Sequence, residues 1–127
     1  MTILPPPKPT DAELEILQLL WQLGPSTVRS VFEVMSTRRT VGYTTVLKML
    51  QIMTDKKLVE RDVSQRSHIY TARMTQEQTQ EQLIGHLAKR AFGGSSAQLV
   101  MHALSSEKAS ADELAQIRML LDGLEES

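Results

Sequence analysis

Residues 43–57 are YTTVLKMLQIMTDKK, and this stretch decides the fold. At the 100° per residue of an α-helix, its large apolar side chains gather on one side of the wheel, which predicts a helix with one buried face. That face consists of Val46, Leu47, Met49, Leu50 and Met53. The opposite side carries a stripe of polar residues, and its chemistry indicates what the helix contacts.

The polar stripe has the spacing i, i+4, i+7 and i+11 and consists mostly of hydrogen-bond donors, a pattern that suits the base edges of a DNA major groove. Its members are Thr44, Lys48, Gln51 and Asp55, with Thr45 at the edge. We expect Lys48 to contact a base edge or a phosphate, although a solvated lysine is the alternative. Thr44 and Thr45 can cap the helix, contact phosphate, or do both.

The residues after this helix predict a β-hairpin. Leu58–Val63 and His68–Thr71 have strand-like composition, and Ser64–Ser67 forms a polar turn between them. Arg66 lies in that turn, where it is either a phosphate ligand or only a soluble turn residue.

The residues before the central helix predict two further helices after a flexible, Pro-rich arm at residues 1–9. Thr10–Glu13 has the pattern of a capping box, and Gly24-Pro25 ends the first helix. Ser26 or Thr27 caps the second helix, and the polar residues 36–40 predict a turn. The apolar stripes are expected at Leu14, Leu17, Leu20 and Trp21 in the first helix, and at Val28, Val31 and Phe32 or Met35 in the second.

Three helices followed by a hairpin have the order of a winged helix-turn-helix, which we place at residues 10–74. Arg38 and Arg39 precede the third helix and are expected to contact backbone phosphate. Tyr43 lies at the boundary of the apolar face, so core packing and DNA contact are both open to it.

Residues 75–127 predict a mainly helical second domain. Gly93-Gly94 separates its first two helices, Ser95 or Ser96 caps the second, and Ser110–Glu113 is a capping box that opens the third. These amphipathic helices together contain too few residues to enclose a hydrophobic core of their own, so we expect a two-fold dimer. The alternative is a monomer in which the helices fold back onto the first domain. The expected dimerisation residues are Leu83, Leu87, Leu99, Val100, Leu104, Leu114, Ile117, Leu121 and Leu124.

Charge and composition support this division and exclude several classes of protein. Residues 26–73 contain nine basic and four acidic residues, whereas residues 76–127 contain four basic and eight acidic ones. A net charge of +5 in the first segment suits a polyanion. With no cysteine, no Gly-rich phosphate loop and no cluster of His and carboxylate, the sequence predicts no enzyme, no metal site and no cofactor. The absence of a long apolar run and of a signal-peptide pattern predicts a cytoplasmic protein.

The motifs in this order resemble the penicillinase-repressor family, which includes the BlaI and MecI repressors and the CopY copper-responsive repressors. The resemblance covers nearly the whole chain and is closest to the BlaI/MecI branch. It rests on Pro9–Trp21, Tyr43–Val46, Lys56–Val59, Arg66 with Tyr70, and the helical tail from Ser110.

This resemblance implies a homodimeric transcriptional repressor that binds an inverted-repeat operator in a β-lactam-response type of system. It also implies a partner protease linked to a membrane sensor, which inactivates the repressor by cleavage in the C-terminal domain. His102-Ala103 stands where the staphylococcal β-lactam repressors have Asn-Phe, so it is the candidate cleavage position. The copper branch senses metal through C-terminal cysteines, and this chain contains none.

A winged helix does not by itself establish DNA binding, so a protein-interaction module is the alternative function. Such a module would favour acidic or apolar residues at positions 44, 48 and 51, where this chain has Thr, Lys and Gln.

Overall fold

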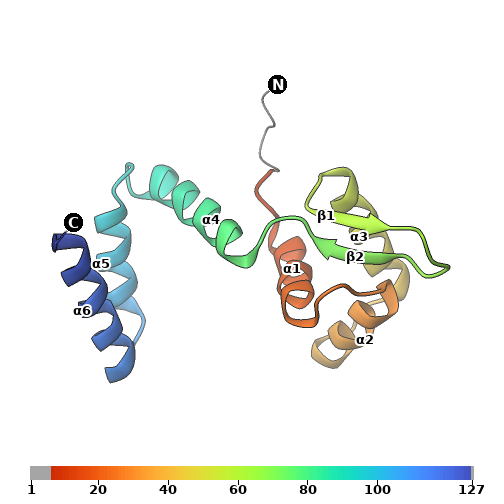
Figure 1. The fold of residues 1–127 in the computed structure, drawn as a ribbon, viewed down its shortest axis with the longest axis horizontal. Coiled ribbons are helices and arrows are strands. Elements are labelled where there is room, and N and C mark those ends of the chain that lie inside the picture. Colours follow the sequence, from red (N-terminus) through yellow and green to blue (C-terminus); the bar gives the residue numbers. More distant parts are fainter. Residues whose placement is uncertain (1–6, 127) are drawn as a thin grey trace. The chain divides into compact units, whose positions relative to one another are not determined.

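A computed structural model describes residues 7–126. Within that range the element order is α1 (Asp11–Leu23), α2 (Val28–Arg38), α3 (Tyr43–Asp55), β1 (Val59–Asp62), β2 (Ile69–Ala72), α4 (Gln76–Ala91), α5 (Ser96–Ser106) and α6 (Ala111–Glu126) (Figure 1). The chain is therefore mainly α, with a helical C-terminal part after three N-terminal helices and a hairpin, as predicted. Of the Pro-rich arm, residues 1–6 lie outside the described residues, and Pro9 is buried.

The first helices begin where local hydrogen bonding predicts. Thr10 Oγ1 accepts from the Glu13 amide at 3.2 Å, and the Glu13 carboxylate accepts from the Thr10 amide at 2.9 Å, which completes the predicted capping box. Of the two candidate caps for α2, Thr27 is the observed one, since its hydroxyl accepts from the Ser30 amide at 3.1 Å.

The predicted turn at residues 36–40 is wrong for its first half, because α2 continues to Arg38. Ser36 and Thr37 remain helical since their hydroxyls donate to the Phe32 and Val34 carbonyls, at 2.8 and 2.6 Å. Because both hydroxyls form hydrogen bonds within the helix, these polar residues do not end it.

The hairpin follows α3 after one residue with left-handed backbone, Lys57 at φ 65°. β1 and β2 pair antiparallel, with Val59 opposite Ala72 and Asp62 opposite Ile69, so the predicted strand ends are shifted by about one residue. Ser26 adds a bridge on the other side of β2, where its amide and carbonyl both bond to Tyr70, at 3.0 and 2.7 Å. These bonds fix the hairpin to the residues that lead into α2.

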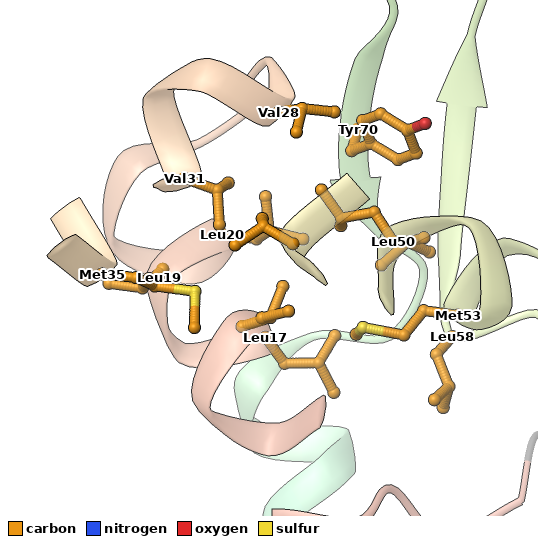
Figure 2. Packing of buried hydrophobic residues seen from close by; sticks show 13 residues of the cluster. Leu17, Leu19, Leu20, Val28, Val31, Met35, Leu50, Met53, Leu58 and Tyr70 are labelled. Carbon is orange, nitrogen blue, oxygen red and sulfur yellow. The ribbon is translucent and has the colours of Figure 1, made fainter. Parts of the chain in front are cut away.

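The core of the winged helix lies between α1, α2, α3 and the hairpin (Figure 2). α1 buries more than the predicted stripe, because α2 and β2 both pack against it: Ile16 and Leu19 are fully buried, whereas Leu14 and Trp21 are only half-buried. The predicted inner face of α3 is confirmed. The core consists of Ile16, Leu17, Leu19, Leu20, Val28, Val31, Met35, Val46, Leu50, Met53, Leu58, Val59 and Tyr70.

The chain separates into two compact units, one up to Leu83 and one from Ile84 onward. Trp21 Nε1 donates to the Met74 carbonyl at 3.0 Å, and Thr79 in the first turn of α4 is buried. These contacts bind the start of α4 to the first unit. The domain limits at 10–74 and 75–127 stay a prediction.

The second unit contains the predicted helix signals. Gly93 and Gly94 adopt φ of 57° and 87°, where glycine is favoured, and end α4. Ser95 caps α5 by accepting from the Gln98 amide at 3.1 Å. Ser110 and Glu113 form the predicted capping box before α6, with bonds of 2.9 and 3.1 Å.

Candidate nucleic-acid interface

The outer face of α3 carries the predicted polar stripe. Val46, Leu50 and Met53 are fully buried, while Thr44, Lys48 and Gln51 on the other side are exposed. The apolar face fixes how the helix is rotated, so the donors of the stripe necessarily point outward. This arrangement leaves the hydroxyl, ammonium and amide groups accessible to an external partner.

The residue that caps α3 is not one of the two threonines expected from the sequence. The capping residue is Gly42, which makes no side-chain cap hydrogen bond, and the helix itself begins at Tyr43. The expectation that Thr44 or Thr45 caps α3 is therefore wrong, because both lie inside the helix. Their exposed side chains remain available for external contacts.

Tyr43 is partly packed against the protein and partly exposed to solvent. Its ring packs against the Phe32 ring in a T-shaped arrangement at a centroid distance of 5.6 Å, and Tyr43 remains 40% exposed. The Arg29 guanidinium lies 5.5 Å from the centroid of the same ring. Tyr43 thus connects α2 to the start of α3 and holds a cation beside the polar stripe.

A cleft of about 500 Å³ lies between α2, the start of α3 and the hairpin loop. It brings together Tyr43 and Arg66, which the sequence predicted as site residues, although they are far apart in the chain. It also includes residues that were not predicted as site residues, chiefly Arg29, Ser30 and His68. Arg29 is one of the nine basic residues counted in residues 26–73, but its position in this cleft follows only from the packing of α2 against α3.

The two arginines before α3 have different surroundings. Arg38 is exposed in the last turn of α2. Arg39 Nη2 lies 2.9 Å from Glu15 Oε1 on α1, so part of its hydrogen-bonding capacity is used within the domain. Contact of Arg39 with phosphate would compete with this ion pair.

A buried carboxylate supports the far end of α3. Glu13 is only 5% exposed, and its Oε2 accepts from Lys56 Nζ at 2.8 Å. Burial by itself raises the pKa of the Glu13 carboxyl, but hydrogen bonds from Lys56 and from the Thr10 amide outweigh it, and the net pKa lies below its ordinary value. The pair joins the start of α1 to the residue that caps α3.

The apolar side chains of α5 and α6 are largely uncovered. Neither helix contains a buried residue within the described range, and Leu121 and Leu124 are 51% and 61% exposed. Among the other expected dimerisation residues, Leu87, Val100 and Leu104 are exposed, while Leu83, Leu99, Leu114 and Ile117 are half-buried. Met101, Met119 and Leu120 add to the exposed apolar surface.

The candidate cleavage position lies inside α5. His102 and Ala103 are exposed, and the His102 ring packs at 5.5 Å from the Phe92 ring. A protease needs an extended substrate, so cleavage there requires α5 to open locally.

Two further observations concern residues 7–126. No group of three or more His, Asp or Glu side chains lies close enough to hold a metal ion in this range. None of its helices has the length and hydropathy needed to cross a bilayer.

Comparison with known proteins agrees with this geometry. The model of the penicillinase repressor family matches residues 9–123. The transcriptional regulator BlaI of Mycobacterium tuberculosis, found in two strains, is 33% identical over 117 residues, which cover 91% of this chain and 83% of the relative. The similarity therefore extends across both compact units.

Proposed function

This chain belongs to the penicillinase repressor family, a family of transcriptional regulators, and we propose that it represses transcription by binding an inverted-repeat DNA operator as a homodimer. The observation that carries the proposal is the orientation of α3, whose buried side anchors the helix while Thr44, Lys48 and Gln51 face outward. Exposed donors on a rigid helix suit the major groove.

Each part of the first unit has a role in this proposal. α3 enters the major groove, where Lys48 and Gln51 approach base edges. Thr44 and Thr45 contact phosphate near the start of the helix. Arg66 in the hairpin loop reaches the adjacent backbone, and Arg38 adds a further phosphate contact. The RNA polymerase is then excluded from the promoter while the repressor is bound.

The second unit supplies the dimer contacts. The exposed apolar side chains of α5 and α6 lose contact with water when a second copy covers them, and this burial is the main source of stability in homodimer interfaces. A two-fold dimer presents two copies of α3. The half-sites of the operator should then be separated by about 10–10.5 bp, or a multiple, because one helical turn returns the groove to the same face.

Binding isotherms test this proposal. Overlapping duplexes from the region upstream of the gene for this chain first locate the binding site, which is then compared at its native spacing and with one half-site moved by five base pairs. The shifted half-site lies on the opposite face of the duplex, so we expect strong binding only to the native one. Equal affinity for both would contradict recognition by a two-fold dimer. Failure to bind any duplex would favour the interaction module.

We further propose regulation of the β-lactam-response type, in which a protease linked to a membrane sensor cuts α5 in the cytoplasm. A cut between Gly93 and Ser105, with His102-Ala103 as the candidate bond, separates the DNA-binding unit from most of the dimer contacts. Two weak monovalent ligands then replace one bivalent ligand, with a loss of about 10²–10⁴-fold in avidity. Mass spectrometry of the protein from β-lactam-treated cells should find a fragment that ends in this window. An intact chain in derepressed cells would contradict this mode of regulation.

A further inference from the structure

The cleft between α2, the start of α3 and the hairpin loop is lined by two arginines, Arg29 and Arg66, and by one carboxylate, Glu33. Its other polar lining includes the hydroxyl of Ser30 and the imidazole of His68. The polar stripe of α3 begins at the edge of this cleft, since Tyr43 is both a lining residue and the first residue of the helix. A partner that contacts the stripe must therefore pass close to the cleft.

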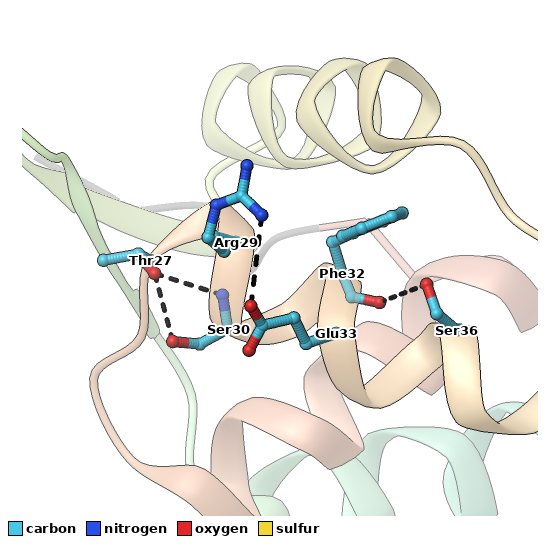
Figure 3. Close-up of polar contacts among 6 residues, drawn as sticks. All are labelled: Thr27, Arg29, Ser30, Phe32, Glu33 and Ser36. Atoms are coloured by element: carbon cyan, nitrogen blue, oxygen red, sulfur yellow. Dashed lines mark hydrogen bonds and ion pairs between the residues drawn. The ribbon is translucent and has the colours of Figure 1, made fainter.

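Arg29 is the better placed of the two arginines. Its guanidinium lies above the Tyr43 ring at 5.5 Å, and Phe32 supports that ring from the side. Figure 3 shows Arg29 directed from α2 toward α3, with a dashed contact to Glu33. The aromatic support limits the positions that this long side chain adopts, which reduces the entropy lost when it binds.

The ion pair of Arg29 with Glu33 is weak enough to be exchanged. Arg29 Nη1 and Glu33 Oε1 are 4.0 Å apart, and the two side chains are 69% and 64% exposed. Exposed pairs of this kind contribute little net stability, because water solvates both groups well. A stronger anion that enters the cleft can therefore replace the carboxylate.

We infer that this cleft receives one phosphate of the DNA backbone, with Arg29 as its principal ligand, and that the phosphate replaces Glu33 as the partner of Arg29. The inference rests on the proposed function and adds to it a contact on α2. Arg29 lies on α2 against the Tyr43 ring and is not part of the polar stripe of α3, so we expect it to meet the backbone beside the groove and not the bases. The planar fork of arginine matches the oxygens of a phosphate, and the cleft has ample room for the group.

The first test is the salt dependence of binding to duplex DNA, measured on operator and on random sequence of the same length. The slope of log K against log salt is negative, and loss of one phosphate contact reduces its magnitude by about 0.9. Arg29→Ala should therefore reduce that magnitude by about 1.8 in a dimer, which loses two contacts. We expect a loss of roughly 10-fold in affinity on both sequences, because phosphate contacts carry little sequence information. Arg29→Lys keeps the charge and should retain the slope with a smaller loss of affinity.

Arg73→Ala provides the matched control. Arg73 is an exposed arginine of the same unit, directly after β2 and at the opposite end of the hairpin from the loop that lines the cleft. Arg73→Ala should leave the salt dependence of binding unchanged. Thermal unfolding of each variant tests folding, and the retained slope of Arg29→Lys separates loss of charge from any loss of packing on Tyr43.

The second test concerns Glu33. Replacement by Gln removes the competing anion and should tighten binding by about 3-fold on both duplexes, since Arg29 no longer has to leave an ion pair. In the Arg29→Ala background the same replacement should have a clearly smaller effect. Equal gains in both backgrounds would contradict the exchange.

The outcomes separate this inference from the proposed function. If the parent protein binds the operator but Arg29→Ala has the same slope as Arg73→Ala, the phosphate contact is wrong and the repressor function stands. If the parent protein binds no duplex, the proposed function itself fails. A loss confined to operator DNA would assign Arg29 to base recognition and would overturn the phosphate assignment.

Discussion

At the scale of single residues, α3 separates the side chains that hold the fold from those that face a partner. Lys48 is exposed on the helix whose other side supplies Val46, Leu50 and Met53 to the core. Substitution of Lys48 therefore changes recognition without removing buried surface. This separation allows binding and stability to be measured independently.

Lys48→Ala should weaken operator binding and leave the thermal stability nearly unchanged. If Lys48 contacts a guanine edge, the loss is about 1–3 kcal/mol, with relaxed preference at one base position in each half-site. If it contacts phosphate, the affinity for every DNA sequence falls, and log K depends less steeply on log salt. Binding isotherms on operator variants decide between the two, with Lys108→Ala, between α5 and α6, as a charge-matched control. Unchanged affinity on every duplex would exclude Lys48 from the interface.

The Glu13 carboxylate should make the winged helix sensitive to acid. Because its pKa is lower in the folded state than the ordinary value of 4.5, its contribution to stability is fully present above that pH. The contribution is lost as the pH falls through the folded-state pKa. Glu13→Gln should cost about 1–3 kcal/mol at neutral pH, since it leaves Lys56 without its carboxylate, and should cost less in acid.

Urea unfolding followed by circular dichroism at neutral and acidic pH measures this difference. Glu60→Gln is the control, because Glu60 is an exposed carboxylate on β1 of the same unit. A cost of Glu13→Gln that stays constant down to the lowest pH would refute the assignment.

At the scale of helices and strands, one glycine inside α4 and one just after its end have opposite roles. Gly85 lies inside the helix, and an added Cβ would meet nothing within 4 Å. Gly93 has the same open surroundings but a φ of 57°. The free space is therefore equal, and only the backbone conformation differs.

Gly85→Ala should stabilise the helix by about 0.5–1 kcal/mol, because alanine loses less backbone entropy on folding. Gly93→Ala should destabilise it by about 1–2 kcal/mol, because the left-handed region is strained for a residue with a Cβ. Thermal unfolding measured by far-ultraviolet circular dichroism shows both shifts. Two shifts of the same sign would contradict the assigned helix end.

Most elements were predictable from the sequence because their signals are local. The capping boxes at Thr10 and Ser110, and the helix end at Gly93, depend only on residues within one turn of each other. The end of α2 was not predictable in this way. Ser36 and Thr37 are typical of a turn, but here their hydroxyls donate to carbonyls of the preceding helical turn and both residues stay helical. Local polarity does not reveal where a hydroxyl will bond.

The candidate site was predictable only in part, for a similar reason. The polar stripe of α3 follows from the 3.6-residue period, which is a property of one helix. The place of Arg29 depends on how α2 packs on α3, and its cleft also needs the hairpin loop 37 residues further along, at Arg66. Tertiary proximity of this kind has no signal in one sequence.

At the scale of the whole molecule, the two compact units differ in how well they bury apolar surface. The unit up to Leu83 has a continuous core, whereas in the described part of the other unit only Ala88 is a buried apolar residue. Leu121 is 51% exposed on α6. A monomer therefore leaves this surface in contact with water, which favours association.

Leu121→Asp should shift the chain toward monomer, because a dimer would bury an unpaired charge in its shared apolar surface. Sedimentation at micromolar concentration measures the change. Leu23→Asp is the matched control, since Leu23 is 47% exposed but lies on α1, outside the proposed interface. A parent chain that sediments as a monomer would contradict the dimer, and an equal effect of both variants would contradict this location of the interface.

The hydrogen bond from Trp21 to Met74 makes the chain its own optical reporter. Trp21 is the only tryptophan in the sequence, so all indole emission originates beside the point where the chain leaves β2 and enters α4. Indole emission depends on the polarity around the ring, and opening of this contact exposes the ring to water. A fluorescence trace therefore follows the junction and the part of the first unit that packs around Trp21, whereas circular dichroism sums the helices of both units. Recorded together, the two signals time the release of α4 separately from the melting of the helices beyond it.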